Sequence, residues 1–222
     1  MSEAEKSVKE ELKDYLEELA PKTGIRVGTP VKTKYMSPFI VRANPEGLYI
    51  LDMNKTRERI EVAANFIART PISKVAVCSA REYGKTPVAK FCELTGATPI
   101  LERFMPGTFT NPLLPNYMEP ELILVTDPQA DQQAVIEATR AGLPVIAVSN
   151  SDNVTSKVDL VIPANNRGRK ALAAVYWLLA KAVLAKLNKI SIEGQPVDKI
   201  IYDGKEYVID DFETKLIEEE VT

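Results

Sequence analysis

The chain has 222 residues, 45% of them hydrophobic, which is enough for one domain with a substantial core. It contains no histidine, and its two cysteines fall in a strand pattern (Cys78) and a helix pattern (Cys92), which argues against a zinc centre, a catalytic histidine and a disulfide framework. The longest apolar run, residues 171–180, is shorter than the about 20 residues that span a bilayer, and the N-terminus has no signal-peptide pattern. We therefore expect a soluble, cytoplasmic protein.

The net charge of −3 is unevenly distributed along the chain. Residues 1–20 carry a net charge of −4 and residues 209–222 carry −5, so residues 21–208 between them carry +6. Acidic ends thus enclose a basic body, which favours an anionic partner.

The first predicted element is an amphipathic helix within residues 1–20. Its apolar side chains share one helical face: Val8, Leu12, Tyr15, Leu16 and Leu19. We expect this helix to pack on its own domain, with a partner-binding arm as the alternative. Residues 21–190 are predicted to form the main domain, and residues 191–222 a β-hairpin extension with an acidic tail.

Strands and helices then alternate along the main domain. A basic loop at residues 29–35 precedes two short strands joined by a turn at 44–47. The elements predicted from there are strands 39–41 and 48–51, helix 55–69, strand 74–79, helix 86–94 and strand 98–101. Residues 103–117, rich in proline and aromatic side chains, are predicted to form a functional loop.

The clearest unit of the chain is a strand, a helix and a second strand. Residues 122–125 and 145–148 are apolar runs of strand length. Small apolar side chains recur between them at helical spacing: Ala134, Val135, Ala138 and Ala141. Asp127 is expected to cap this helix, Pro128 to begin it and Gly142 to end it. A connection of this length leaves the two strands parallel, with the helix over one face.

The remaining elements are a strand at residues 158–162, a helix at 167–187 and a hairpin at 199–209 whose turn is Asp203–Gly204. The alternation predicts a three-layer α/β domain, with a mainly parallel sheet and helices on both faces. It does not define the order of the strands.

The first candidate site is the segment SAREYGKT, residues 79–86. Its last three residues match the end of a phosphate-binding P-loop: Gly84, Lys85 and Thr86. Asp127 could supply the acid that holds magnesium, which would make the chain a nucleotide-binding enzyme. However, Ser79 replaces the first glycine of the motif. The competing interpretation is a plain turn in which Thr86 caps the helix and Pro87 begins it.

The second candidate site consists of polar side chains at predicted strand ends: Asp52, Asp127, Asn150 and Asp152. Ligands of open α/β sheets bind at the carboxyl ends of the strands. Asp127 and Asp131 could hold a hard cation through oxygen ligands. Aspartates are also common in helix caps and turns, so a purely structural role is the alternative.

The third candidate site is basic and lies where two helices are predicted to start. Cations there oppose the helix dipole, at about 0.3–1 kcal/mol for each exposed charge, and a bound anion would remove the conflict. Asn165, Asn166 and Gly168 lie among the cations of the second start. Such a site could bind RNA or another polyanion, and a solvated surface is an equal alternative. The residues predicted to face RNA are Lys32, Lys34, Arg42, Lys55, Arg57, Arg59, Arg103, Arg167, Arg169 and Lys170.

Several motifs, taken in order, are specific to one family. They are PFIVRANPEGLYILDMNKT, PGTFTN, LVTDPQAD, GLPVIAVSNSDN, VDLVIPANN and ALAAVYWLLA. From about residue 28 to residue 187, the chain resembles the universal small-subunit ribosomal protein family numbered two, in its archaeal and eukaryotic, laminin-receptor-like branch.

The resemblance implies a flavodoxin-like α/β domain without enzymatic activity, cofactor, metal or small-molecule substrate. It also implies contacts with small-subunit ribosomal RNA and with neighbouring ribosomal proteins near the junction of head and body, and no membrane contact. Residues 111–121 form a short link where bacterial members carry a coiled-coil insertion. A free-standing protein-binding module that uses the N-terminal helix and the acidic tail is a further alternative.

Overall fold

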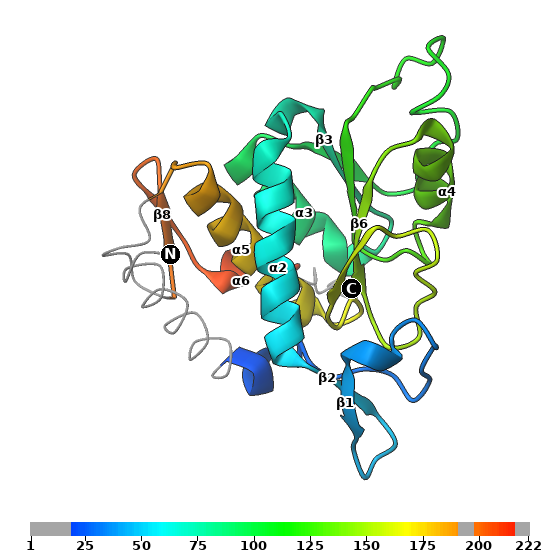
Figure 1. The fold of residues 1–222 in the computed structure, drawn as a ribbon. Coiled ribbons are helices and arrows are strands. Elements are labelled where there is room, and N and C mark those ends of the chain that lie inside the picture. The colour runs from blue at the N-terminus through cyan, green and yellow to red at the C-terminus, as the bar shows by residue number, and fades with distance from the viewer. Residues whose placement is uncertain (1–18, 191–197, 216–222) are drawn as a thin grey trace, which may run out of the picture.

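A wholly parallel, five-stranded sheet forms the centre of the computed structural model, which describes residues 19–190 and 198–215 (Figure 1). Its strands are β3 (Val75–Ser79), β4 (Thr98–Leu101), β5 (Leu122–Val125), β6 (Val145–Ser149) and β7 (Leu160–Pro163). They lie in the order β4-β3-β5-β6-β7. The flavodoxin-like doubly wound folds have this order, so the predicted fold class is confirmed.

Helices cover both faces of the sheet and produce three layers (Figure 1). On one face, α5 (Arg169–Lys186) packs against α2 (Met53–Arg69) and α3 (Glu82–Thr95). The helix α4 (Gln132–Ala141) covers the other face. Successive side chains of a strand point to opposite faces, so Leu122 and Leu124 join the larger apolar core while Ile123 and Val125 join the smaller one.

Two antiparallel hairpins flank the sheet. The first pairs β1 (Ile40–Ala43) with β2 (Tyr49–Leu51) and follows the short 3-10 helix η1 (Ser37–Phe39). A second short 3-10 helix, η2 (Ile72–Lys74), leads into β3.

The second hairpin pairs β8 (Ile200–Tyr202) with β9 (Lys205–Tyr207) and leads into the short helix α6 (Ile209–Phe212). Its turn has positive φ at Asp203 (51°) and Gly204 (73°), the conformation that an Asp-Gly hairpin turn needs. The hairpin prediction is therefore confirmed. Ile200, Tyr207 and Phe212 join the larger core. The division of the chain at residue 190 remains a prediction.

The start of α3 was predicted incorrectly. The helix begins at Glu82, with Arg81 at the N-cap, so Thr86 does not cap it and Pro87 lies inside it. Pro87 has no N–H for the carbonyl group of Tyr83 one turn earlier. The hydroxyl group of Thr214 donates to this carbonyl instead, at 3.2 Å, and a partner distant in sequence thus supports a proline inside the helix.

The start of α4 was also predicted incorrectly. It begins at Gln132 with Asp131 at the N-cap, so Asp127 and Pro128 lie in a turn before the helix. The Asp127 carboxylate accepts the backbone N–H of Gln129 in that turn (2.9 Å). Ala141, predicted on the apolar face, is exposed, whereas Gly142 ends the helix in the left-handed conformation as expected (φ 75°).

The predicted N-terminal helix lies outside the described residues except for its last two, Leu19 and Ala20, which are buried in a short helical turn. Cys78 and Cys92 are buried free thiols, as predicted. Within residues 19–190 and 198–215, no helix is long and apolar enough to cross a membrane.

Candidate nucleic-acid interface

The carboxyl ends of the five parallel strands meet at one edge of the sheet, which we call the carboxyl edge. It comprises residues 79–81, 101–103, 126–127, 149–153 and 163–167, which end or directly follow β3, β4, β5, β6 and β7. Of the polar and charged residues singled out in the sequence, these segments contain Asp127, Asp152, Asn150, Asn165, Asn166, Arg103 and Arg167. Asp52 precedes α2 and Asp131 precedes α4, so neither lies on them. The topology therefore gathers candidate residues that are far apart along the chain.

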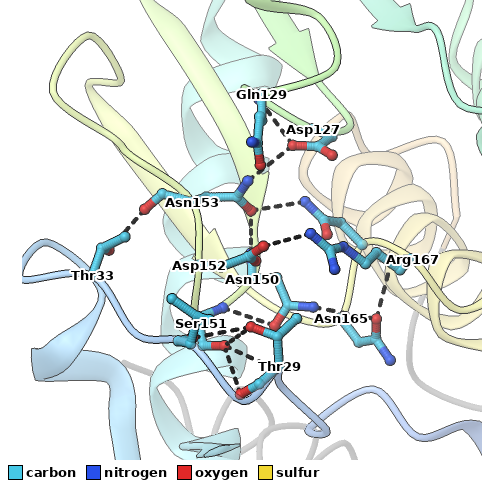
Figure 2. Close-up of polar contacts among 12 residues, drawn as sticks. Thr29, Thr33, Asp127, Gln129, Asn150, Ser151, Asp152, Asn153, Asn165 and Arg167 are labelled. Carbon is cyan, nitrogen blue, oxygen red and sulfur yellow. Dashed lines mark hydrogen bonds and ion pairs between the residues drawn. The ribbon is translucent and has the colours of Figure 1, made fainter.

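Asparagine side chains connect the ends of β5, β6 and β7 (Figure 2). The carbonyl oxygen of the Asn153 side chain accepts hydrogen bonds from the Asn150 backbone (2.6 Å) and from the Asn166 side chain (3.0 Å). Its amide nitrogen donates to Oδ1 of Asp127 (3.0 Å). All three asparagines are buried, so this network fixes the loops that leave the sheet.

A second set of hydrogen bonds ties the loop at residues 29–33 to the carboxyl edge (Figure 2). Ser151 Oγ accepts the Thr29 N–H (2.9 Å) and shares a hydrogen bond with the Thr29 hydroxyl group (2.9 Å). Thr33 donates its N–H to the Ser151 carbonyl group (2.9 Å) and its hydroxyl group to the Asn153 carbonyl group (2.8 Å). Lys32 and Lys34 flank Thr33, so the backbone that carries both lysines is held at this edge.

The start of α5 lies at the same edge. Oδ1 of Asn165 accepts the backbone N–H groups of Arg167 (3.0 Å) and Gly168 (3.2 Å), which stand just before the helix. Gly168 is the N-cap and offers no side-chain acceptor to the first turn, which begins with Arg169 and Lys170. The helix therefore starts with cations and without a carboxylate cap.

Two cations at this helix start have carboxylate partners. The guanidinium group of Arg167 forms an ion pair with Asp152 (Figure 2), and Nε of Arg169 lies 2.6 Å from Oε1 of Glu213. Arg167 and Lys170 are both exposed. The ion pairs reduce the net positive charge of this surface, and each engages one guanidinium nitrogen of its arginine.

The start of α2 differs from the start of α5. Asp52 is the N-cap and accepts the Asn54 N–H (3.0 Å), so a carboxylate already occupies the N-terminus and relieves the predicted dipole conflict. The hydroxyl group of Thr56 donates to the Pro163 carbonyl group at the end of β7 (2.6 Å), which fixes α2 at the carboxyl edge. Nζ of Lys55 donates to the Pro38 carbonyl group.

Aromatic rings hold two more of the predicted cations. Lys32 lies over the ring of Tyr49 with Nζ 5.2 Å from the centroid, and the Arg59 guanidinium lies 5.6 Å from the centroid of Phe39. Arg57 is half-buried on α2. Lys34, Arg42, Arg103 and Lys170 are exposed and have no carboxylate partner in the part of the chain that the structure describes.

The predicted cations therefore do not form one compact cluster. Lys32, Lys34, Lys55 and the cations of the α5 start lie around the ends of β6 and β7, whereas Arg103 follows β4 at the edge of the sheet and Arg42 lies on the β1–β2 hairpin.

The turn that resembles a P-loop is filled by the protein's own side chains. Oδ1 of Asp131 accepts the Ala80 N–H (2.8 Å), a donor that a phosphate cradle would leave free for its ligand. Nε of Arg81 donates to Oδ2 of Asp127 (2.6 Å). Nζ of Lys85 lies 2.8 Å from Glu82 and 3.5 Å from Glu102. These contacts leave neither a free lysine nor a free magnesium-binding aspartate.

Gly84 is required for helix packing and not for the close approach of a phosphate group. A Cβ atom at this position would lie 2.2 Å from Ser79 Oγ and 3.2 Å from Thr126 Cγ2. The glycine thus lets α3 approach the ends of β3 and β5.

The two aspartates proposed as cation ligands differ in how their charges are compensated. Asp127 is fully buried and neutralised by Arg81. Asp131 is 2% exposed, and its Oδ2 has no hydrogen-bond partner. Burial, assisted by the charge of Asp127, raises the pKa of Asp131 to about 6. Within residues 19–190 and 198–215, no cluster of three His, Cys, Asp or Glu side chains could hold a metal ion.

Sequence reasoning missed two contributors to this edge. Arg81 neutralises Asp127, and Asn153 joins three strand ends. The signal for Asn153 was present in the sequence SNSDN directly after an apolar strand, since a cluster of short amides there has buried backbone groups to satisfy. Arg81 gave no comparable signal, because its partner Asp127 follows a different strand, β5.

Comparison with known proteins agrees with the family resemblance. The family model described as Ribosomal protein S2 matches residues 115–185. The chain is 55% identical over 199 residues to "Small ribosomal subunit protein uS2" of Nitrosopumilus maritimus (strain SCM1), an alignment that covers 90% of this chain and 92% of the relative.

Two further archaeal proteins with the same name are similar over nearly their whole length. The protein of Cenarchaeum symbiosum (strain A) is 52% identical over 207 residues, which cover 93% of this chain and 95% of the relative. The protein of Thermoplasma acidophilum is 46% identical over 200 residues, which cover 90% and 96%. The similarity thus extends well beyond the segment that the family model matches.

Proposed function

The chain belongs to the family of small ribosomal subunit protein uS2, and from this we propose that it binds small-subunit ribosomal RNA and neighbouring ribosomal proteins in the cytoplasmic ribosome. Its relatives support a structural ribosomal role, and the family is a class of structural proteins rather than enzymes. RNA recognition is then the task of cations that position phosphate groups.

The observation that carries the proposal is the convergence of cations on the carboxyl edge around β6 and β7. Hydrogen bonds anchor the backbone beside Lys32 and Lys34, and they anchor the start of α5 with Arg167 and Lys170. Cations on an anchored backbone lose less conformational freedom when they bind a phosphate. This arrangement suits a phosphate backbone that runs across the edge.

The start of α5 is the strongest single position for a phosphate group. Its N-cap has no side-chain acceptor, its first turn carries Arg169 and Lys170, and Arg167 precedes it. A helix N-terminus with free N–H groups and nearby cations favours an anion. The start of α2 is weaker in this respect, since Asp52 already caps it.

No feature of the SAREYGKT turn favours the alternative of a nucleotide-binding enzyme. The N–H group of Ala80 is bound by Asp131, and Lys85 is paired with acidic side chains. Lys85 and Asp127 are therefore already paired within the fold.

The experiment is a salt titration of binding to purified small-subunit ribosomal RNA. Each phosphate contact contributes about −0.7 to −0.9 to the slope of log affinity against log salt. The double variant Lys34→Ala/Lys170→Ala removes two exposed cations of the carboxyl edge and should reduce the steepness of the slope by about 1.4 to 1.8.

The matched control is Lys157→Ala/Lys186→Ala, which removes two exposed lysines before β7 and at the end of α5. This control should leave the slope unchanged. A salt-independent affinity, or an equal effect of both double variants, would contradict the proposed interface.

A further inference from the structure

The loop between β4 and β5, residues 102–121, is held in place by a buried carboxylate. Glu137 on α4 is buried, and its two oxygens accept the N–H groups of Gly107 (2.8 Å) and Phe109 (2.9 Å) and the hydroxyl group of Thr110 (3.1 Å). Charge-assisted hydrogen bonds of this kind are about twice as strong as neutral ones. The loop is therefore an ordered structure despite its lack of helix or strand.

Apolar side chains and turns secure the rest of the loop. Phe104 and Phe109 enter the smaller core, with ring centroids 4.9 Å apart. The N–H group of Met118 donates to the Thr108 carbonyl group (2.9 Å), which fixes the returning arm. At the tip, Oδ1 of Asn111 accepts the Leu113 N–H (3.1 Å), so the backbone of the tip is also defined.

This ordered loop presents two large apolar side chains to solvent. Leu113 is 91% exposed and Met105 is 56% exposed. The neighbouring Leu114 is instead turned inward, with Cδ1 2.8 Å from the place where Gly107 would carry a Cβ atom. The loop projects at the end of the molecule opposite the β1–β2 hairpin (Figure 1). Single exposed leucines are common on protein surfaces, but here the surrounding backbone is fixed in place.

The charge of the loop favours a protein over RNA as its partner. Residues 104–121 contain no lysine or arginine, and their only charges are Glu119 and Glu121. Both glutamates are exposed, although Glu121 is paired with Lys74. Residues 104–121 therefore offer phosphate groups no cation of their own, and Arg103 lies at the base of the loop, on the carboxyl edge. The surface of the loop complements an apolar pocket with a cationic rim.

We propose that the β4–β5 loop is a preformed docking knob for a neighbouring protein, with Leu113 and Met105 entering an apolar pocket that cationic side chains surround. Because Glu137 and the phenylalanines order the loop beforehand, binding requires little further ordering. This inference rests on the proposed function in one respect, namely that the partner is a protein of the small ribosomal subunit. It places the protein contact on the β4–β5 loop rather than on the cations around β6 and β7.

The test compares Leu113→Ser with Leu113→Met in two binding assays. One assay uses small ribosomal subunits stripped of their own copy of this protein, and the other uses naked small-subunit ribosomal RNA. Leu113→Ser should bind stripped subunits about tenfold more weakly or worse, because a buried leucine is lost from the contact. It should bind naked RNA as the unchanged protein does, and Leu113→Met should retain affinity in both assays.

The outcomes separate this inference from the proposed function. Equal binding of Leu113→Ser and the unchanged protein to stripped subunits overturns the docking knob, as does a loss of naked-RNA binding in Leu113→Ser. Failure of the unchanged protein to bind naked RNA overturns the RNA interface instead. Since Leu113 is exposed, urea unfolding of both variants should match that of the unchanged protein.

A photo-crosslinking side chain at position 113 gives an independent readout in assembled subunits. A crosslink to one small-subunit protein supports the docking knob. A crosslink to ribosomal RNA, or no crosslink, overturns it.

Discussion

Three buried carboxylates show how the surroundings of one chemical group determine its role. Asp127 is neutralised by Arg81, and Glu137 is satisfied by donors from the β4–β5 loop. Asp131 receives the Ala80 N–H on one oxygen, while its other oxygen is buried without a partner. The charged form of Asp131 is therefore poorly solvated.

Asp131 should make the protein less stable as the pH rises. Burial raises its pKa from 3.8 to about 6, so between these values the folded protein holds a proton that the unfolded chain has lost. The free energy of unfolding contributed by this group falls across that window, by roughly 3 kcal/mol, and is constant above it. Urea unfolding of the unchanged protein and of Asp131→Asn, measured at several pH values, tests this.

Comparing the two proteins isolates the effect of Asp131, because all other titrating groups are common to both. The difference in unfolding free energy, unchanged protein minus Asp131→Asn, should fall between pH 3.8 and about 6 and then level off. A difference that does not vary with pH would show that Asp131 titrates alike in both states.

At the scale of elements, the contact of α3 with the sheet depends on one missing side chain. A Cβ atom on Gly84 would lie 2.2 Å from Ser79 Oγ, so Gly84→Ala should lower the free energy of unfolding by about 1–3 kcal/mol. This loss should appear although alanine favours a helix over glycine by about 1 kcal/mol. Chemical denaturation of the variant measures it.

A double-mutant cycle identifies the cause of that loss. Ser79→Ala removes the nearest atom, so the double variant Ser79→Ala/Gly84→Ala should be more stable than the two single effects predict by about 1 kcal/mol. If the effects simply add, the clash with Ser79 is not what makes the glycine necessary.

Strands and helix ends were not equally predictable from the sequence. The strands of the central sheet were found within one or two residues because most are short apolar runs, and β3, β5 and β6 are buried along their whole length. The starts of α3 and α4 were missed because distant partners determine them. Thr214 satisfies the carbonyl group that Pro87 leaves open, and Arg81 binds the aspartate that was expected to cap α4.

The sequence predicted which cations lie near the candidate interface, but not which acidic side chains pair with them. The basic body and the cations beside two helix starts follow from the sequence alone. The partners Asp152 and Glu213 could not be inferred, since Asp152 meets Arg167 through the adjacency of β6 and β7, and Glu213 meets Arg169 through the packing of α6 on α5.

At the scale of the whole molecule, the fold separates two kinds of surface. The carboxyl edge carries cations around the ends of β6 and β7, whereas the tip of the β4–β5 loop exposes Leu113 and carries no charge. A protein that binds RNA at one end and a protein neighbour at the other needs a rigid body between them. The parallel sheet, buried on both faces, provides it.

Whether residues 198–215 belong to that rigid body is testable through Phe212. This side chain is fully buried in the same core as Trp177, the only tryptophan, whose Nε1 donates to the Tyr207 carbonyl group (3.3 Å). Phe212→Ala should therefore lower the stability of the whole protein by about 3–5 kcal/mol. Tryptophan fluorescence and far-ultraviolet circular dichroism should still follow one common urea transition.

The control is Ile201→Ala, which truncates a side chain that is 38% exposed and should have a small effect. A fluorescence transition that precedes the loss of helix signal would show that the C-terminal hairpin unfolds as a separate unit.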